Sequence, residues 1–457
     1  MQRLITIGLL TSLLALAGCT VGPNYRRPIV NVPDTYRHQT PTAQTAPAVS
    51  LGDEKWWQVF QDQELQKLVR RALENNYDVR TAATRILQAQ AELRITRSNQ
   101  FPTINGQTGY TGEQIPIFGY NLVELLGAFS WNVDFWGQYR RATEAARASL
   151  LASEWNQKEV VSTLVMNVAE GYFQLRELDL ELEIAKRTLA SRKESLQLTE
   201  TLANGGATSL LDVRQAEQLV ETAAETIPDV ERQIGQQEDF LSTLLGENPH
   251  DIARGQKLTE QPLPVEIPAG LPSRVLEQRP DIRQAEQQLI AANAEIGVAR
   301  AQLFPSLPLT GAAGTATSNL SSLFTVGGSW SYSAPITQPI FTAGRLRSNV
   351  KLAEAQQQQL LLQYEQTIQQ AFRQVSDALI AFRKYREFRE HQELLTAAAQ
   401  DAARLSGIRY KGGTTSYLEV LTNDTNYFSA ELNLARAQLN ERISLVQVYN
   451  SLGGGWQ

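Results

Sequence analysis

The chain contains one sequence pattern twice. Phe101-Pro102 recurs as Phe304-Pro305, a shift of 203 residues (304 − 101). Asn204-Gly205-Gly206 recurs as Lys411-Gly412-Gly413, a shift of 207 residues (411 − 204). A near-constant shift over most of the chain predicts one structural unit built twice. We expect each copy to hold a hairpin of strands, a very long helix, a tight turn and a returning helix.

The N-terminus has the pattern of a removable secretory signal. Arg3 supplies the positive charge, and the apolar run Leu4 to Ala17 is too short for a spanning helix. Leu16-Ala17-Gly18-Cys19 resembles a bacterial lipobox, so residues 1–18 are expected to leave and Cys19 to carry a covalent lipid. The alternative is a plain signal peptide with an incidental Cys. Cys19 is the only Cys, which excludes an internal disulfide.

Composition excludes several classes of protein. With 457 residues and a net charge of −6, the chain lacks the basic surface of a general nucleic-acid binder. No stretch after the signal is apolar enough for a transmembrane helix. A mature protein that spans a membrane would therefore have to do so through β-strands closed into a barrel.

Two segments alternate between apolar and small polar side chains. The apolar positions are Phe129, Trp131, Val133 and Phe135 in the first copy, and Trp330, Tyr332, Ala334 and Ile336 in the second. Period two with aromatic residues on one face is typical of an outer-membrane barrel strand, although a half-buried strand of a soluble sheet has the same period. We expect β-hairpins at about 102–136 and 305–341, with loops at roughly Gly112–Asn121 and Ser318–Gly328. Four strands leave open edges, so copies must pool their strands, as a dimer or a larger ring.

The segments after the hairpins predict long helices. Val168, Leu175, Leu182, Leu189 and Leu196 recur every seven residues, which is a coiled-coil spacing. We expect long helices at about 138–203 and 345–410, ended by positive-φ turns at Gly205, Gly206, Gly412 and Gly413. Returning helices should follow at about 209–245 and 416–452, with Ser209 and Ser416 as N-caps and a kink at Pro228.

These elements divide the chain into five parts. They are the signal peptide at 1–18, an N-terminal arm and equatorial segment at 19–61, a first repeat at 62–246, an equatorial connector at 247–272 and a second repeat at 273–457.

At this point the sequence resembles the TolC family of outer membrane factors, and in particular its lipoprotein branch around OprM and NodT. The matching stretches run along almost the whole mature chain. They include Cys19 to Pro28, Trp56-Trp57 with Phe60 and Asp62, Arg279 to Arg283 with Ala285-Glu286, Pro339-Ile340-Phe341 with Gly344, and Tyr410 with Gly413, Tyr417 and Leu418.

The resemblance implies a mixed α and β membrane protein that assembles as a homotrimer. Its twelve-stranded outer-membrane β-barrel, with four strands from each protomer, would continue into a long periplasmic α-helical barrel ringed by a small equatorial α/β domain. It also implies an exit duct of a tripartite efflux pump for drugs or other small molecules. The partners would be a periplasmic adaptor and an inner-membrane transporter, expected to be proton-driven. The chain would be lipid-anchored at Cys19 in the outer membrane of a Gram-negative bacterium and would need no other cofactor.

The resemblance further places a gate at the periplasmic helix tips. The matching positions are Tyr410, Leu418, Glu419 and Thr422, with Asp212 as the first-copy counterpart of Glu419 (419 − 212 = 207). Carboxylates crowded round a narrow axis would favour cations. Thr422 stands where close relatives have Asp, and Thr415 stands where the namesake of the family has a gate-locking Arg, so Arg409 and Arg214 are the nearest basic candidates for inter-helix pairs.

No enzyme is expected. The sequence shows no nucleophile–base pair, no paired carboxylates and no metal-ligand spacing among His38, His250 and His391. Two alternatives to an efflux duct remain, one of them also an export duct and the other a structural protein. A type I protein-secretion duct would share this architecture, and a structural envelope lipoprotein would need the helices but not the aromatic hairpins.

Overall fold

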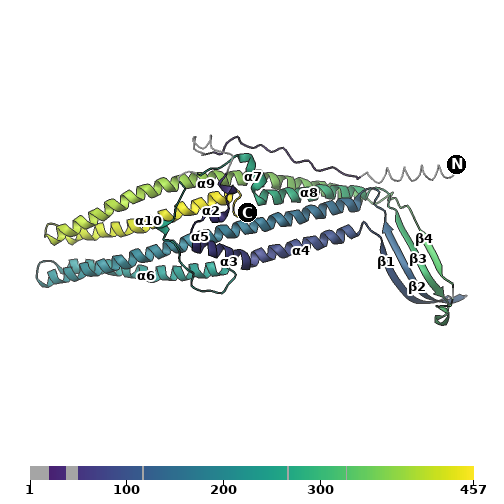
Figure 1. The fold of residues 1–457 in the computed structure, drawn as a ribbon, viewed down its shortest axis with the longest axis horizontal. Helices are drawn as coiled ribbons and strands as arrows, with labels where there is room; N and C mark the ends of the chain where they lie inside the picture. The colour runs from purple at the N-terminus through teal and green to yellow at the C-terminus, as the bar shows by residue number, and fades with distance from the viewer. Residues whose placement is uncertain (1–19, 38–49, 116–117, 265–266, 326) are drawn as a thin grey trace. The chain divides into compact units, whose positions relative to one another are not determined.

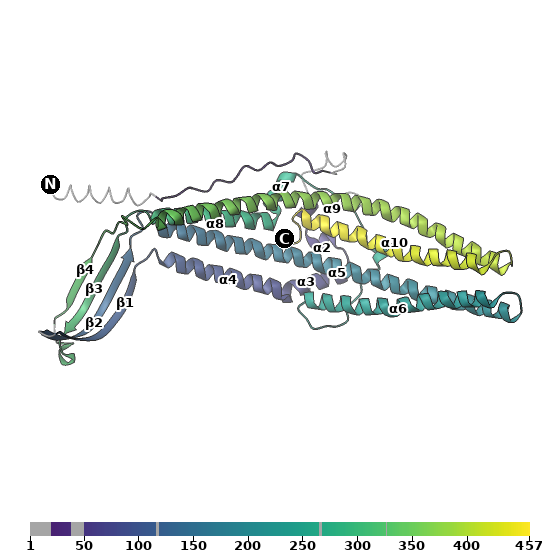
Figure 2. The same ribbon diagram turned by 180° about the vertical axis from the view of Figure 1, so that it is seen from behind.

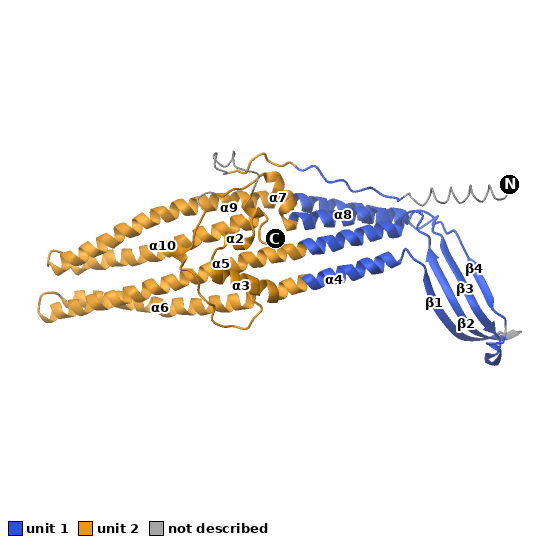
Figure 3. Ribbon diagram, viewed as in Figure 1, with its two compact units in different colours: residues 1–30, 83–155, 282–367 blue, residues 31–82, 156–281, 368–457 orange. Residues whose placement is uncertain are grey.

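The computed structural model describes residues 20–37, 50–115, 118–264, 267–325 and 327–457 (Figure 1). Cys19, His38 and the signal peptide lie outside these residues. The chain forms two compact units, which Figure 3 colours separately. Unit 1 comprises residues 1–30, 83–155 and 282–367, and unit 2 comprises residues 31–82, 156–281 and 368–457.

Unit 1 holds a four-stranded antiparallel sheet in the order β1-β2-β3-β4 (Figures 1 and 2). The strands are β1 (Thr103–Ile115), β2 (Phe118–Asn132), β3 (Pro308–Thr317) and β4 (Ser329–Ser333). Strands β2 and β3, from different sequence copies, pair with Val123 opposite Thr317 and Asn132 opposite Pro308. The sheet is therefore one surface shared by both copies, with β1 and β4 at its edges.

The first predicted loop was wrong in its bounds. Gly112 pairs with Asn121 as part of the ladder between β1 and β2, which continues to Ile115 opposite Phe118. Cross-strand bonds stabilise this extension, because the Tyr110 hydroxyl donates to Asn121 Oδ1 at 3.1 Å. In the second hairpin β4 ends at Ser333, two residues before Pro335, which has no N–H to donate to a ladder.

Four helix segments of unit 1 adjoin the strands. They belong to α4 (Tyr77–Ser98), α5 (Gln138–Asn204), α8 (Pro280–Ala301) and α9 (Arg345–Lys411). Small residues allow these helices to approach closely: Ala145, Ala148 and Ala152 on α5 are all buried. Gly22 in the N-terminal arm lies against Gly297 of α8, where a Cβ added to Gly22 would stand 2.5 Å from the Gly297 Cα. Neither position can therefore accept a larger side chain without moving the backbone.

Unit 2 contains the rest of the long helices and their returning partners, α6 (Leu210–Leu244) and α10 (Tyr417–Ser451). Each long helix has 67 residues and each returning helix has 35. The predicted seven-residue stripe is fully buried at Val168 and Leu175 and only partly buried farther along α5. α6 continues through Pro228 without a break, so the expected kink there stays a prediction.

The equatorial segments of unit 2 form short helices around a buried carboxylate. The helices are η2 (Leu51–Asp53), α2 (Trp56–Val59), α3 (Gln63–Asn75), η3 (Leu258–Glu260) and α7 (Pro272–Gln278). Asp62 caps α3, accepts the Tyr172 hydroxyl at 2.9 Å, and accepts the Gln256 N–H at 3.0 Å. Within the described part of unit 2 there is no strand, so the strand content expected for an equatorial α/β domain was wrong. The connector has side-chain partners instead of a ladder, since Gly255 N also donates to the Tyr172 hydroxyl.

Among the residues described here, no helix combines the length and the apolar character that crossing a bilayer requires.

Candidate functional site

The two helix–turn–helix tips of unit 2 have nearly the same backbone. Gly206 and Gly413 adopt φ of 72° and 68°, a region that disfavours side chains with a Cβ. Ala207 N donates to Leu202 O, and Thr414 N donates to Arg409 O in the equivalent bond. The preceding glycines, 205 and 412, are not in the left-handed region, so only the second glycine of each pair has the predicted positive φ.

Asp212 lies in the first turn of α6 and closes the helix start. Its carboxylate accepts the Ser209 N–H, while the Ser209 hydroxyl accepts the Asp212 N–H at 3.3 Å. Thr208 also donates its hydroxyl to the Asp212 carboxylate. This reciprocal capping box satisfies donors that a helix start leaves without partners. The predicted N-cap role of Ser209 is confirmed, whereas Ser416 occupies the N-cap position of α10 without a side-chain bond.

Glu419 lies in the first turn of α10 and bridges back to the preceding helix. Its carboxylate pairs with Arg409 Nη1 of α9 at 2.8 Å and accepts the Thr415 hydroxyl. Arg409 thus makes the inter-helix pair for which it was a candidate. Arg214 does not, because it pairs with Glu217 on its own helix at 2.6 Å.

The remaining predicted gate positions differ in exposure. Leu418 is 56% exposed, and the Thr422 hydroxyl donates to the Leu418 carbonyl of its own helix at 2.9 Å. Tyr410 connects the two tips, since its hydroxyl donates to Thr208 Oγ1 at 3.3 Å. Its ring stands edge-on to Tyr417 at 5.1 Å, and Tyr417 is buried against α6. Tyr410 therefore links the second tip to the first.

Sequence reasoning missed a buried charged contact one to two turns farther along α10. Arg192 of α5 is buried, pairs with Asp424 at 2.7 Å and donates to the Leu219 carbonyl at 2.8 Å. Its guanidinium also lies over the Phe428 ring, 4.8 Å from the centroid. One side chain thus connects α5, α6 and α10. Its only sequence signal is a lone arginine between apolar heptad positions.

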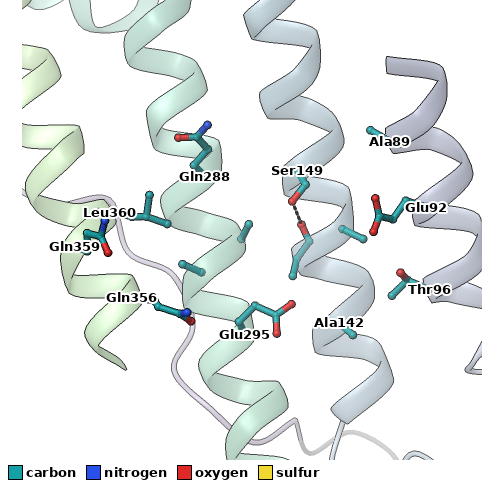
Figure 4. Close-up of a pocket in the computed structure, with 14 residues that line it drawn as sticks. Ala89, Glu92, Thr96, Ala142, Ser149, Gln288, Glu295, Gln356, Gln359 and Leu360 are labelled. Carbon is teal, nitrogen blue, oxygen red and sulfur yellow. Dashed lines mark hydrogen bonds between the residues drawn. The ribbon is translucent and has the colours of Figure 1, made fainter. Parts of the chain in front are cut away.

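A hollow of about 820 Å³ in unit 1 is lined by all four helices, α4, α5, α8 and α9 (Figure 4). Most of its lining is alanine and glutamine, so methyl groups and uncharged amides make up most of its surface. Glu92 and Glu295 supply carboxylates to it, and Figure 4 shows both side chains directed into the space between the helices. Burial raises the pKa of Glu295 above its ordinary value. Within the described residues no group of three or more His, Cys, Asp or Glu side chains could hold a metal ion.

Comparison with known proteins identifies the family. The family model described as "Outer membrane efflux protein" matches residues 68–247 and 271–454. The chain is 35% identical to the cation efflux system protein CusC of Escherichia coli over 449 residues, which cover 97% of each chain. It is 38% identical to the solvent efflux pump outer membrane protein SrpC of Pseudomonas putida, again with 97% of each chain covered.

Solved structures agree with the sequence comparisons. The outer membrane channel MtrE of Neisseria gonorrhoeae, solved in its open state, is 33% identical and superposes with a TM-score of 0.88 over 96% of this chain and 99% of that one. Fold and relatives together define a passive outer-membrane efflux channel of a Gram-negative bacterium that extends into the periplasm, and not an enzyme. This chain belongs to the outer membrane efflux protein family, as an outer membrane factor of the OprM and NodT type.

Proposed function

We propose that three copies of this chain form the outer-membrane exit duct of a tripartite efflux pump, which conducts small molecules passively to the exterior. The observation that carries the proposal is the open sheet of unit 1. Its four antiparallel strands end in two edge strands, β1 and β4, and edges are not tolerated in lipid. Three such sheets, joined edge to edge, would close a twelve-stranded barrel.

The helices support the same arrangement. Each strand of the sheet is adjacent in sequence to one of the four helices α4, α5, α8 and α9, so a ring of strands would continue into a ring of helices. The hollow lined by these four helices would then be part of the lumen. Its alanine and glutamine lining offers no strong binding site, which suits a passage through which varied solutes move. Glu92 and Glu295 would give this passage a preference for cations.

The helical tips are the proposed gate and docking surface. Leu210, Leu211 and Leu418 are 67%, 64% and 56% exposed, and apolar side chains gathered at exposed positions are typical of protein contacts. We assign the docking of a periplasmic adaptor to these tips. The pair between Arg409 and Glu419 holds α9 to α10 in the present tip. Binding that separates this pair would loosen the second tip and its Tyr410–Thr208 contact with the first, while the capping box of the first tip stays closed.

The relatives indicate only the chemical class of the cargo. Relatives of this chain are named for the efflux of cations, solvents, toluene and antibiotics, which are all small solutes. This favours small-molecule efflux over whole-protein secretion for the present chain.

The N-terminal arm supports a lipid at Cys19. Val21 N donates to the Trp136 carbonyl at 3.0 Å, and Thr20 lies against Gly137, where strand β2 has ended and α5 is about to begin. The residue after Cys19 is therefore held beside the strand–helix junction. An acyl chain on Cys19 would enter the membrane there.

Single-channel conductance in a planar bilayer tests the duct and its gate. The assembled wild-type oligomer should give small, cation-selective openings. Glu419→Gln should give larger or more frequent openings, because Arg409 loses its partner. The matched control is Glu217→Gln, which removes the same charge from an ion pair near the first tip that stays within one helix. The cognate adaptor should increase conductance in the wild type more than in Glu419→Gln.

Each result has a distinct meaning. No conductance from a correctly assembled oligomer would refute the duct and favour a structural lipoprotein. Conductance that neither substitution changes would keep the duct and refute the proposed gate.

A further inference from the structure

A basic groove lies between α4 and α5 in unit 1, separate from the hollow lined by four helices. It has a volume of about 570 Å³, and its basic lining consists of Arg94 and Arg97 from α4 with Arg140 and Arg147 from α5. We call these four residues and the space between them the arginine groove.

The arginine groove and the hollow use opposite faces of α5. The hollow takes residues 142, 145, 146 and 149, whereas the groove takes residues 140, 143, 144 and 147. At about 100° per residue, the average directions of these two sets differ by roughly 160°. If the hollow faces the lumen, the groove faces outward.

Three of the four arginines have no ion-pair partner within the described residues. Arg140 is held by Asp134 and by the Asp134 carbonyl. Arg94, Arg97 and Arg147 are exposed and make no hydrogen bond or ion pair within the residues that the structure describes.

The other exposed arginines of the chain fall into two groups. Some pair with a carboxylate, as Arg214 does with Glu217, Arg232 with Asp229 and Arg404 with Asp401, each three residues away. Others, such as Arg85 and Arg373, are exposed and make no ion pair within the described residues. The groove differs from these isolated side chains because three unpaired arginines, from two helices, line the same space. Three unpaired guanidinium groups that converge on one groove repel one another and favour an anion between them.

The only carboxylate in the groove is already neutralised. Glu144 accepts Arg141 Nη1 at 2.8 Å, and the buried Arg141 also donates to Asn24 Oδ1 of the N-terminal arm at 2.7 Å. Glu144 thus contributes little negative potential to the groove, which keeps its positive character.

The groove lies at the level where the strands begin. Arg97 is in the last turn of α4, and β1 starts at Thr103. Gln100 lines the groove, and its carbonyl accepts the indole N–H of Trp131 at 3.0 Å, close to the end of β2. Tryptophan is enriched where a membrane meets water. Arg147 lies farther along α5, but side chains on a helix tilt toward its N-terminus, which here is the strand end.

We propose that the arginine groove binds the phosphodiester headgroup of an anionic phospholipid, such as phosphatidylglycerol or cardiolipin, from the periplasmic leaflet of the outer membrane. The guanidinium fork matches the oxygens of a phosphate and pairs with two of them at once. Basic pockets at the edge of a membrane bind such headgroups. The assignment rests on the proposed function, which puts β1 to β4 in the bilayer.

The test measures lipid retained by the intact oligomer. Oligomers purified in detergent are incubated with equal amounts of phosphatidylglycerol, cardiolipin and phosphatidylethanolamine, and bound lipid is counted by native mass spectrometry. The wild type should retain the two anionic lipids at least about tenfold better than the zwitterionic one, since each charge-assisted contact contributes a factor of about ten or more. Arg94→Gln/Arg147→Gln should lose most of this preference.

Two further variants make the result specific. Arg214→Gln/Arg232→Gln removes the same charge from α6 and should retain lipid as the wild type does. Arg94→Lys/Arg147→Lys keeps the charge but loses the fork, so retention should fall between the wild type and the glutamine variant.

Three outcomes would overturn the proposal. They are equal lipid retention by the wild type and the glutamine variant, equal loss in the α6 control, and displacement of the lipid by inorganic phosphate at millimolar concentration, which would make the groove a site for free anions.

Measuring the conductance of the same preparations distinguishes failure of this proposal from failure of the proposed duct. A glutamine variant that conducts normally but has lost anionic lipid supports the groove, whereas a wild type that does not conduct refutes the duct whatever lipid it holds.

Discussion

Replacing Glu177 by glutamine should stabilise this protein at neutral pH. Glu177 and Glu181 lie one turn apart on α5, and each is 4% exposed. Burial, and then the neighbouring carboxylate of Glu181, raise the pKa of Glu177 well above its ordinary value, to about 8. Arg436 of α10 pairs with Glu181 at 3.0 Å and offsets only part of this effect. At pH 7 the folded chain must therefore hold a proton that the unfolded chain releases.

The size of the effect follows from the linkage between pKa and stability. Because the folded pKa of Glu177 is raised, its cost to stability is absent below about pH 4.5, grows as the pH rises toward 8 and is constant above that. Each pKa unit corresponds to about 1.4 kcal/mol, so the cost at pH 7 is roughly 3 kcal/mol per chain. At pH 5 it is below about 1 kcal/mol. Glutamine cannot ionise, so Glu177→Gln should lack this cost at every pH.

Hydrogen exchange at the amides of α5 around Glu177 measures the difference. At pH 7 these amides should exchange roughly a hundredfold more slowly in Glu177→Gln than in the wild type, and at pH 5 only a few-fold more slowly. Glu194→Gln is the matched control, because Glu194 is an exposed carboxylate of the same helix, and it should change nothing. Equal or faster exchange in Glu177→Gln at pH 7 would refute the reasoning.

Two shorter predictions concern the anchor and a buried ion cluster. The mature wild-type N-terminus should carry a lipid on Cys19, and Cys19→Ser should lack it but stay in the outer membrane, because one lipid anchor binds a bilayer only weakly; an unmodified Cys19 in the wild-type mass spectrum would contradict this. Glu441 is 1% exposed and pairs with Arg386 at 3.1 Å and with Arg389 at 2.6 Å, so Glu441→Gln should destabilise the chain by about 3–5 kcal/mol. The melting temperature should fall clearly below that of the exposed-site control Glu390→Gln, and equal melting would contradict the prediction.

Sequence patterns predicted the long helices well because the relevant forces are local. Between residues 138 and 204 there is no proline, and the seven-residue spacing of apolar side chains needs no knowledge of the partner helix. The N-cap at Ser209 was also predicted, and the structure completes it into a capping box with Asp212. The same spacing of serine and acid at Ser416 and Glu419 forms no such box. The capping box gives Asp212 a structural role in its own turn, beside the gate role that its correspondence to Glu419 predicts.

The features that sequence reasoning missed depend on contacts between distant segments. The strand extension beyond Thr111 rests on Tyr110, which reaches across to Asn121, and the sequence alone does not show this contact. In the described part of the equatorial segments no strand forms, and backbone groups there bond to Asp62, the N-cap of α3, and to Tyr172 of α5. The partner of Arg192 lies 232 residues away, which no local pattern reveals.

The two copies of the repeat differ in how their tips hold a carboxylate. Thr208 and Thr415 occupy equivalent positions (415 − 208 = 207), and each donates its hydroxyl to the acid four residues on. The second carboxylate, on Glu419, also pairs with Arg409, but the position equivalent to Arg409 in the first copy (409 − 207 = 202) is a leucine, so that copy has no such cation.

This difference suggests separate roles for the tips. The first tip is closed by bonds within its own turn and within α6, which a partner could leave undisturbed. The second tip is held by an exposed ion pair between two helices, and such pairs contribute little stability and weaken in salt. Because Tyr410 of the second tip also bonds to Thr208 of the first, movement of α9 would break a contact between the tips without unfolding either turn. We therefore propose that the duplicated unit keeps one rigid tip and one that can open at small energetic cost.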